Sequence, residues 1–238
     1  EEGISEFSFA GIYLFRREHA YRISALENGL LAITGADGDR PFFMLPFGLP
    51  GPEVLRDLFA RHGSMKAVSE SQAPILASMG YETTADRDNF DYLYSRAELV
   101  ALAGRKYHKK KNLFHAFIRN NDCEARPLLE TYRDDALAVL EGWKARNGEV
   151  GDYHAALGAL HRMEELQQCG GIFYVDGEPV SYCLGEELAL GTTYVVHFEK
   201  AVTSEKYKGV YQYTNRAFAS VLPDKYVTIN REQDVGDP

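Results

Sequence analysis

The chain has 238 residues, of which 45% are hydrophobic and 12% aromatic, a composition that supports a substantial core and excludes global disorder. The formal net charge of −9 excludes a protein that coats nucleic acid through an overall basic surface, but it permits a local basic groove. No apolar run approaches the ~18 residues that span a membrane, and no signal peptide is visible, so we expect a soluble, cytoplasmic protein.

The first part of the chain has the pattern of a mixed α/β unit. Asn28 and Gly29 favour a hairpin turn because both residues accept a positive φ, and Pro52 is typical of the first turn of a helix. In chain order we expect a helix at 5–16, strands at 21–26, 30–34 and 42–45, helices at 52–61 and 71–79, and strands at 81–85 and 90–95.

The second part has a more regular order of elements. We expect helices at 96–103 and 105–119, a strand at 122–126, helices at 127–146 and 153–168, strands at 172–175, 179–187 and 192–198, a helix from Gly209, and a strand at 225–230. This order indicates a mixed sheet with helices on its faces and matches the first two-thirds of the GNAT acyltransferase topology. We therefore predict an α/β fold of two tandem GNAT-like domains, residues 1–95 and 96–238, from element order alone, since no internal repeat supports it.

Metal and redox chemistry find little support in the sequence. Cys123, Cys169 and Cys183 are widely spaced and form no CxxC pattern, which indicates a reducing compartment. His154 and His161 share one predicted helix, but no third ligand completes a zinc pattern, so we predict no metal site.

The stretch from Thr193 to Tyr213 predicts a strand, a polar loop, a glycine and a helix. This layout presents backbone N–H groups to an anion at a helix N-terminus, and Lys206 and Lys208 flank Gly209 there. An ordinary strand–helix connection with two solvated lysines is the alternative interpretation.

The densest basic cluster in this acidic chain consists of Arg105, Lys106, Lys109, Lys110 and Lys111. Lys110 precedes Phe114 by four residues and Phe117 by seven, so it lies on or beside the apolar face of the predicted helix. A lysine there must snorkel, pair or contact a ligand. The cluster is either a solvated face or a patch for phosphate or an RNA backbone.

Four segments, at 86–94, 102–117, 196–212 and 229–236, carry a resemblance to a known family. They contain DRDNFDYLY, LAGRKYHKKKNLFHAF, VHFEKA with YKGVYQ, and INREQDVG. Together they resemble the bacterial family related to the C-terminal domain of phosphatidylglycerol lysyltransferase, whose members are mostly uncharacterised. The resemblance covers nearly the whole chain and implies tandem GNAT-like domains akin to Fem-type aminoacyltransferases. Members typically continue past the NREQD motif, so we expect the second domain to lack its C-terminal elements in this chain.

The resemblance also implies a place for the acyl donor. GNAT domains bind the pantetheine and pyrophosphate of acyl-CoA through the loop Arg/Gln-x-x-Gly-x-Gly/Ala. This chain keeps the central glycine but has Lys206 at the first position and Tyr211 at the last. A tyrosine there crowds a pyrophosphate, which favours an aminoacyl-tRNA donor or a site without catalysis. The candidate donor-binding residues of this loop and helix are Lys206, Lys208, Gly209, Tyr211 and Gln212.

Aminoacyl transfer needs a base or proton relay and donors for a developing oxyanion. His197 and Glu199 are two residues apart at a strand end, where side chains share one face, and we predict that they are the catalytic pair. The alternatives are a hydrogen-bonded sheet residue for His197 and a salt bridge to Lys200 or Arg231 for Glu199.

Further polar residues follow the last predicted strand. The residues expected at the same sheet edge as the catalytic pair are Asn230, Arg231, Glu232 and Asp234. Arg231 suits a bidentate contact to carboxylate or phosphate. Asp91 and Tyr92 are expected either to line a cleft or to contribute only to packing.

These observations predict an acyl- or aminoacyltransferase acting on an amine or hydroxyl of a small or lipid-like acceptor. Its co-substrate is an acyl-CoA or an aminoacyl-tRNA, the latter held partly by Arg105, Lys106, Lys109 and Lys110, and no cofactor is bound covalently. The alternative is a non-catalytic GNAT-like module that binds an acyl-CoA or another anionic metabolite. No Gly-x-Ser-x-Gly elbow, Walker A motif or dinucleotide fingerprint occurs.

Overall fold

The computed structural model describes residues 3–148 and 151–233, which form two compact units. The division lies between Phe90 and Asp91. We expected the boundary after Ser95, and the strand Asp91–Ser95 pairs with the sheet of the second unit.

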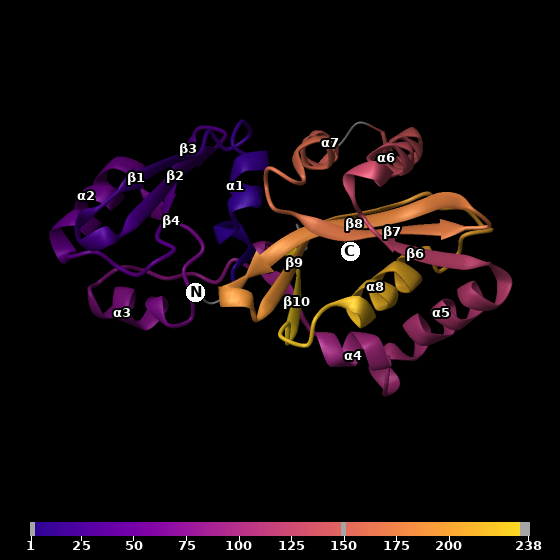
Figure 1. Ribbon diagram of the computed structural model, residues 1–238. Helices are drawn as coiled ribbons and strands as arrows, with labels where there is room; N and C mark the ends of the chain where they lie inside the picture. The colour runs from indigo at the N-terminus through magenta and orange to yellow at the C-terminus, as the bar shows by residue number, and fades with distance from the viewer. Residues whose placement is uncertain (1–2, 149–150, 234–238) are drawn as a thin grey trace. The chain divides into compact units, whose positions relative to one another are not determined.

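The first unit contains, within its described residues, a four-stranded sheet in the order β1-β2-β3-β4 (Figure 1). Strands β1 (Arg22–Ala25), β2 (Leu31–Asp37) and β3 (Arg40–Met44) are antiparallel, and the short β4 (Ser64–Met65) runs parallel to β3. The helices are α1 (Phe9–Leu14), α2 (Pro52–His62) and α3 (Gln72–Ser78). Phe43, Leu55 and Leu76 are buried in its core, so β3, α2 and α3 each cover an apolar side chain there.

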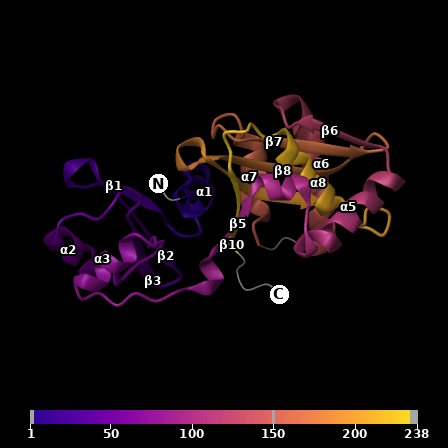
Figure 2. The same cartoon turned by 90° about the horizontal axis from the view of Figure 1, so that it is seen from below.

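The second unit has, within its described residues, a six-stranded sheet in the order β5-β10-β9-β8-β7-β6. The strands are β5 (Asp91–Ser95), β6 (Cys123–Pro127), β7 (Cys169–Val175), β8 (Glu178–Leu188), β9 (Thr193–Ala201) and β10 (Thr228–Gln233). The helices are α4 (Arg96–Ala101), α5 (His108–Asn120), α6 (Arg133–Asn147), α7 (Tyr153–Arg162) and α8 (Val210–Val221). Helices α6 and α7 cover one face of the sheet, and α4, α5 and α8 cover the other (Figures 1 and 2).

This topology confirms the predicted mixed α/β, GNAT-like fold. Strand β9 is antiparallel to β8 and parallel to β10, so the sheet is mixed. The parallel pairing of β9 with β10 covers only Thr193–Val195 and Thr228–Asn230. Past this pairing both strands continue without hydrogen-bonding to each other, and side chains occupy the space between them.

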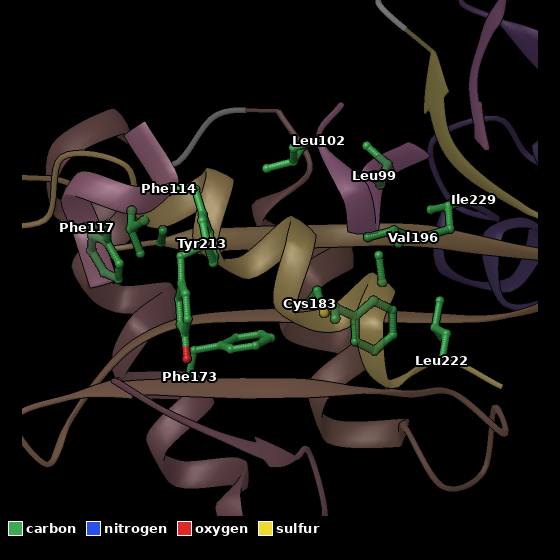
Figure 3. Packing of buried hydrophobic residues seen from close by; sticks show 14 of the residues in the cluster. Leu99, Leu102, Phe114, Phe117, Phe173, Cys183, Val196, Tyr213, Leu222 and Ile229 are labelled. Carbon is green, nitrogen blue, oxygen red and sulfur yellow. The ribbon is translucent and has the colours of Figure 1, made fainter. Parts of the chain in front are cut away.

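The core under α8 holds these elements together (Figure 3). The ring of Tyr213 on α8 lies 5.2 Å from that of Phe117 on α5 and 5.7 Å from that of Phe173 on β7. On the next turns of α8, the Phe218 ring lies 5.2 Å from that of Tyr194 on β9. Full burial of such a side chain contributes roughly 1.5–3 kcal/mol, so α8 is fixed against both the sheet and α5.

A β-bulge interrupts the pairing of β8 with β9. Leu184 pairs with Phe198 and Gly185 pairs with Val196, which leaves His197 as an extra residue on β9. A Cβ on Gly185 would lie 1.9 Å from the carbonyl oxygen of Val195, so only glycine fits at this close approach. After the bulge, the side chains of β9 alternate between the two faces of the sheet in a register shifted by one residue.

Three predicted elements differ from the observed ones. The segment 5–16 forms a 3₁₀ turn at Ser5–Phe7 and then α1, because the Ser8 hydroxyl accepts a hydrogen bond from the Gly11 N–H and starts the helix there. No strand forms at 81–85, since the Tyr81 ring stacks on Phe59 of α2, 4.3 Å between centroids. Helix α6 begins later than predicted because its expected first residues belong to β6 and a 3₁₀ turn.

Candidate functional site

A cavity of about 230 Å³ opens in the second unit beside β9 and β10. It is lined by Tyr94, Leu99, Lys110, Glu199, Tyr211, Asn215 and Arg231. These residues come from β5, β9 and β10 and from the three helices α4, α5 and α8. The cavity therefore lies on the face of the sheet that these helices cover.

Glu199 is the buried carboxylate of the cavity, with a side chain only 7% exposed. Its Oε1 accepts a hydrogen bond from Nδ2 of Asn215, 2.8 Å away. Its Oε2 lies 2.9 Å from Nη2 of Arg231. The salt bridge to Arg231 that the sequence offered as one alternative is present, whereas Lys200 pairs with Asp152 at 2.6 Å.

Burial raises the pKa of Glu199 above its ordinary value, and the nearby Arg231, Asn215 and Lys110 offset that rise only in part. A carboxylate with a raised pKa is a better proton acceptor near neutral pH than an exposed one. Each of its oxygens keeps a second lone pair beyond the contact it already makes. Glu199 is therefore more basic than an exposed carboxylate, and it borders the cavity.

Lys110 of α5, which we expected on or beside the apolar face of its helix, lines the cavity. Its Nζ lies 5.2 Å from the centroid of the Tyr94 ring, a cation–π distance. Burial and the charge of Arg231 lower the pKa of Lys110, while the carboxylate of Glu199 opposes this. Two cations thus stand around one carboxylate.

His197 belongs to a different cluster and does not line the cavity. Its fully buried ring contacts Glu232 through Nδ1 and Glu186 through Nε2, the latter at 2.9 Å. Burial alone would lower the pKa of His197, but the two carboxylates outweigh it and raise the pKa to about 9. The ring is therefore an imidazolium at neutral pH. We expected the side chains of His197 and Glu199 to share one face of β9 because they are two residues apart. The bulge at His197 interrupts this alternation, and the two side chains have no contact partner in common.

The loop before α8 makes contacts of its own. The Val210 N–H donates to the Tyr207 carbonyl oxygen. Lys206 pairs with Asp176 at 3.1 Å, and Lys208 is exposed. A Cβ on Gly209 would lie 2.7 Å from the carbonyl oxygen of Leu113, so the close packing of α8 on α5 explains this glycine.

The other predicted residues are dispersed. Arg105 and Lys109 are exposed, and Lys106 pairs with Glu98 at 2.7 Å. Asn230 is buried and donates through Nδ2 to Asp91, 2.6 Å away. Gln212 is half-buried on α8 outside the cavity lining, and Asp234 lies outside the described residues.

The family of the chain follows from a comparison with protein-family models. Residues 1–234 match the model for the C-terminal region of phosphatidylglycerol lysyltransferase. The chain belongs to this family. The resemblance found in its sequence motifs is therefore confirmed, and comparison with curated proteins gave no significant match.

Solved structures of this family and of a Fem-type protein share the fold. A conserved protein of unknown function from Bacteroides thetaiotaomicron has a TM-score of 0.89 at 28% identity, covering 100% of this chain and 84% of its own. The C-terminal domain of a putative lysylphosphatidylglycerol synthetase from Agrobacterium fabrum has a TM-score of 0.67 at 12% identity, covering 97% and 75%. FemX has a TM-score of 0.60 at 7% identity, covering 97% and 83%.

Three residues that line the cavity were not predicted from the sequence: Tyr94, Leu99 and Asn215. Asn215 follows Tyr211 by four residues on α8, so helical spacing could have placed them together. Tyr94 lies in the DRDNFDYLY segment, but its place beside the cavity depends on the pairing of β5 with β10, which is distant in the chain. Leu99 has the sequence pattern of an ordinary core residue.

The described residues contain no group of three or more His, Cys, Asp or Glu side chains placed to hold a metal ion. No helix among residues 3–148 and 151–233 is long and apolar enough to cross a bilayer.

Proposed function

We propose that this protein is an aminoacyltransferase whose reaction takes place at the cavity of Glu199. The observation that carries the proposal is a buried carboxylate of raised pKa that faces open space between two cations. This is the arrangement that proton removal from an amine or hydroxyl requires, with positive charge close to the oxygen that becomes negative.

The reaction would proceed by nucleophilic attack on an ester. The acceptor passes its N–H or O–H proton to Glu199 while its lone pair forms a bond to the ester carbonyl carbon. The bond from that carbon to the ribose oxygen of the donor then breaks, and the leaving oxygen takes the proton from Glu199. Arg231 would stabilise the negative charge on the carbonyl oxygen.

An aminoacyl-tRNA is the donor that fits these features best. The fold is shared with FemX and with a domain of a putative lysylphosphatidylglycerol synthetase. Lys110 of α5 lines the cavity, and Lys109, Lys110 and Lys111 are all exposed on that helix, with Arg105 just before it. Such a basic face on an acidic protein suits a phosphate backbone.

A second candidate is a binding module without catalysis, and one observation favours it. Two cations surround a single carboxylate, so the cavity would hold an anionic group such as that of an acyl-CoA or a small metabolite even if no transfer followed. Tyr211 occupies the position where a pyrophosphate-binding loop has a small residue, which disfavours ordinary acyl-CoA use.

Transfer of label from a mixture of charged tRNAs to amine, hydroxyl and anionic-lipid acceptors tests the proposal. Glu199→Gln should lower the transfer rate about 100-fold or more while leaving donor affinity within about threefold, since general-base catalysis contributes about 10²–10⁴-fold. Glu124→Gln, which changes an exposed carboxylate on β6 outside the cavity, is the matched control. Turnover by Glu199→Gln at the normal rate would contradict the proposal, and donor binding without any turnover of the unmodified protein would favour the binding module.

A further inference from the structure

Lys110 is the cation of the cavity that lacks a carboxylate partner. Within the described residues its Nζ makes no ion pair within 4 Å, and its neighbour is the ring of Tyr94. Arg231, by contrast, is already paired with Glu199. The other lining residues, Tyr94, Leu99, Tyr211 and Asn215, are uncharged, so the cavity has one positive charge in excess when Glu199 is ionised.

This charge pattern acts on the side chain of any aminoacyl group that enters. Glu199 is the one carboxylate of the lining, and the proposed reaction uses it as the base. A lysyl side chain would bring a second ammonium beside Lys110 and Arg231, and no lining residue would compensate it. A side-chain carboxylate would instead meet two cations, one of them free to pair.

The size of the cavity agrees with a short side chain. Its volume of about 230 Å³ lies below the ~300–1,000 Å³ of pockets that enclose drug-sized ligands. A cavity of this size holds one small group rather than a drug-sized ligand.

We propose that the cavity selects an aminoacyl group with a carboxylate side chain and excludes a lysyl group, with Lys110 as the residue that determines this specificity. The proposal rests on the aminoacyltransferase function above and names its substrate class. A bound carboxylate would also favour the protonated form of Lys110, against the burial and the charge of Arg231 that lower its pKa.

Binding of non-hydrolysable analogues tests the selection directly. The probes are 3′-aminoacylamino-3′-deoxyadenosines carrying aspartate, alanine or lysine, titrated by calorimetry into the full chain. We expect affinity in the order aspartyl, alanyl, lysyl, with at least a tenfold difference between the first and the last. A lysyl analogue that binds as tightly as the aspartyl analogue would overturn the proposal, and so would the absence of binding by all three.

A charge-reversal pair of variants shows whether Lys110 is responsible. Lys110→Glu should weaken the aspartyl analogue tenfold or more and strengthen the lysyl analogue. Lys109→Glu, with the same charge change one residue earlier on α5 and outside the cavity lining, should keep the original order. Circular dichroism confirms that both variants are folded. An unchanged order in Lys110→Glu would contradict the proposal.

The two proposals fail in different ways. If the analogues bind in the expected order but no charged tRNA supports transfer, the selection stands and the transferase function falls. If lysyl-tRNA supports transfer as fast as aspartyl-tRNA, the transferase function stands and the selection by Lys110 falls.

Discussion

Strands β9 and β10 each contribute to two clusters of charged side chains. One cluster lines a cavity, and the other does not. Glu199 and Arg231 form one, together with Asn215, and they line a cavity. His197 and Glu232 form the other with Glu186, and they do not line it. Each strand thus contributes neighbouring residues to both clusters.

The difference follows from local geometry on both strands. On β9 the bulge at His197 shifts the alternation of side chains. On β10 Glu232 has a left-handed φ of 57°, and its N–H donates to Oδ1 of Asn230 at 2.8 Å. These two irregularities separate a cluster with room for a ligand from one filled by its own partners, so residue type alone does not identify the site.

Removing His197 should have the largest effect on stability. His197→Ala leaves the carboxylates of Glu186 and Glu232 without their shared cation, and loss of one partner of a buried ion pair costs about 3–5 kcal/mol. Because these carboxylates are 14% and 23% exposed, we expect about 3 kcal/mol lower free energy of unfolding, measured by urea denaturation.

The matched change in the other cluster should behave differently. Glu199→Gln removes a charge that burial disfavours but leaves Arg231 unpaired, so the free energy of unfolding should change by no more than about 1 kcal/mol. Equal destabilisation by the two variants would show that both clusters are purely structural.

The pH dependence of stability should report the same cluster. The pKa of His197 is raised from its ordinary value of ~6.5 to about 9 in the folded protein, so folding favours the protonated ring. Its contribution is fully present below pH ~6.5 and is lost as the pH rises through about 9, amounting to as much as about 3 kcal/mol.

Unfolding by urea between pH 6 and pH 9.5 measures this loss. His197→Gln should lack the part of the decline that His197 causes, so the difference between the two pH profiles isolates it from lysines and tyrosines that titrate in the same range. Parallel profiles for the two proteins would contradict an imidazolium held by Glu186 and Glu232.

The order of elements could be predicted from the sequence because hydrophobic periodicity and turn residues are local signals. The positions of β8, β9 and α8 agreed closely with expectation. The bulge at His197 could not be predicted, because it depends on how Gly185 meets the backbone of Val195 on another strand. The role of Tyr94 depends likewise on pairing between β5 and β10, which are far apart in the chain.

The smallest effect is expected at Lys206, which the sequence suggested for binding an anion. Its side chain is 57% exposed and pairs with Asp176, itself 51% exposed, in a loop outside the cavity lining. Exposed pairs contribute little to stability, so Lys206→Ala should leave the melting temperature, donor affinity and transfer rate unchanged within error. A tenfold loss of donor affinity in this variant would show that the loop before α8 binds the donor, and the site would then extend from the Glu199 cavity to the start of that helix.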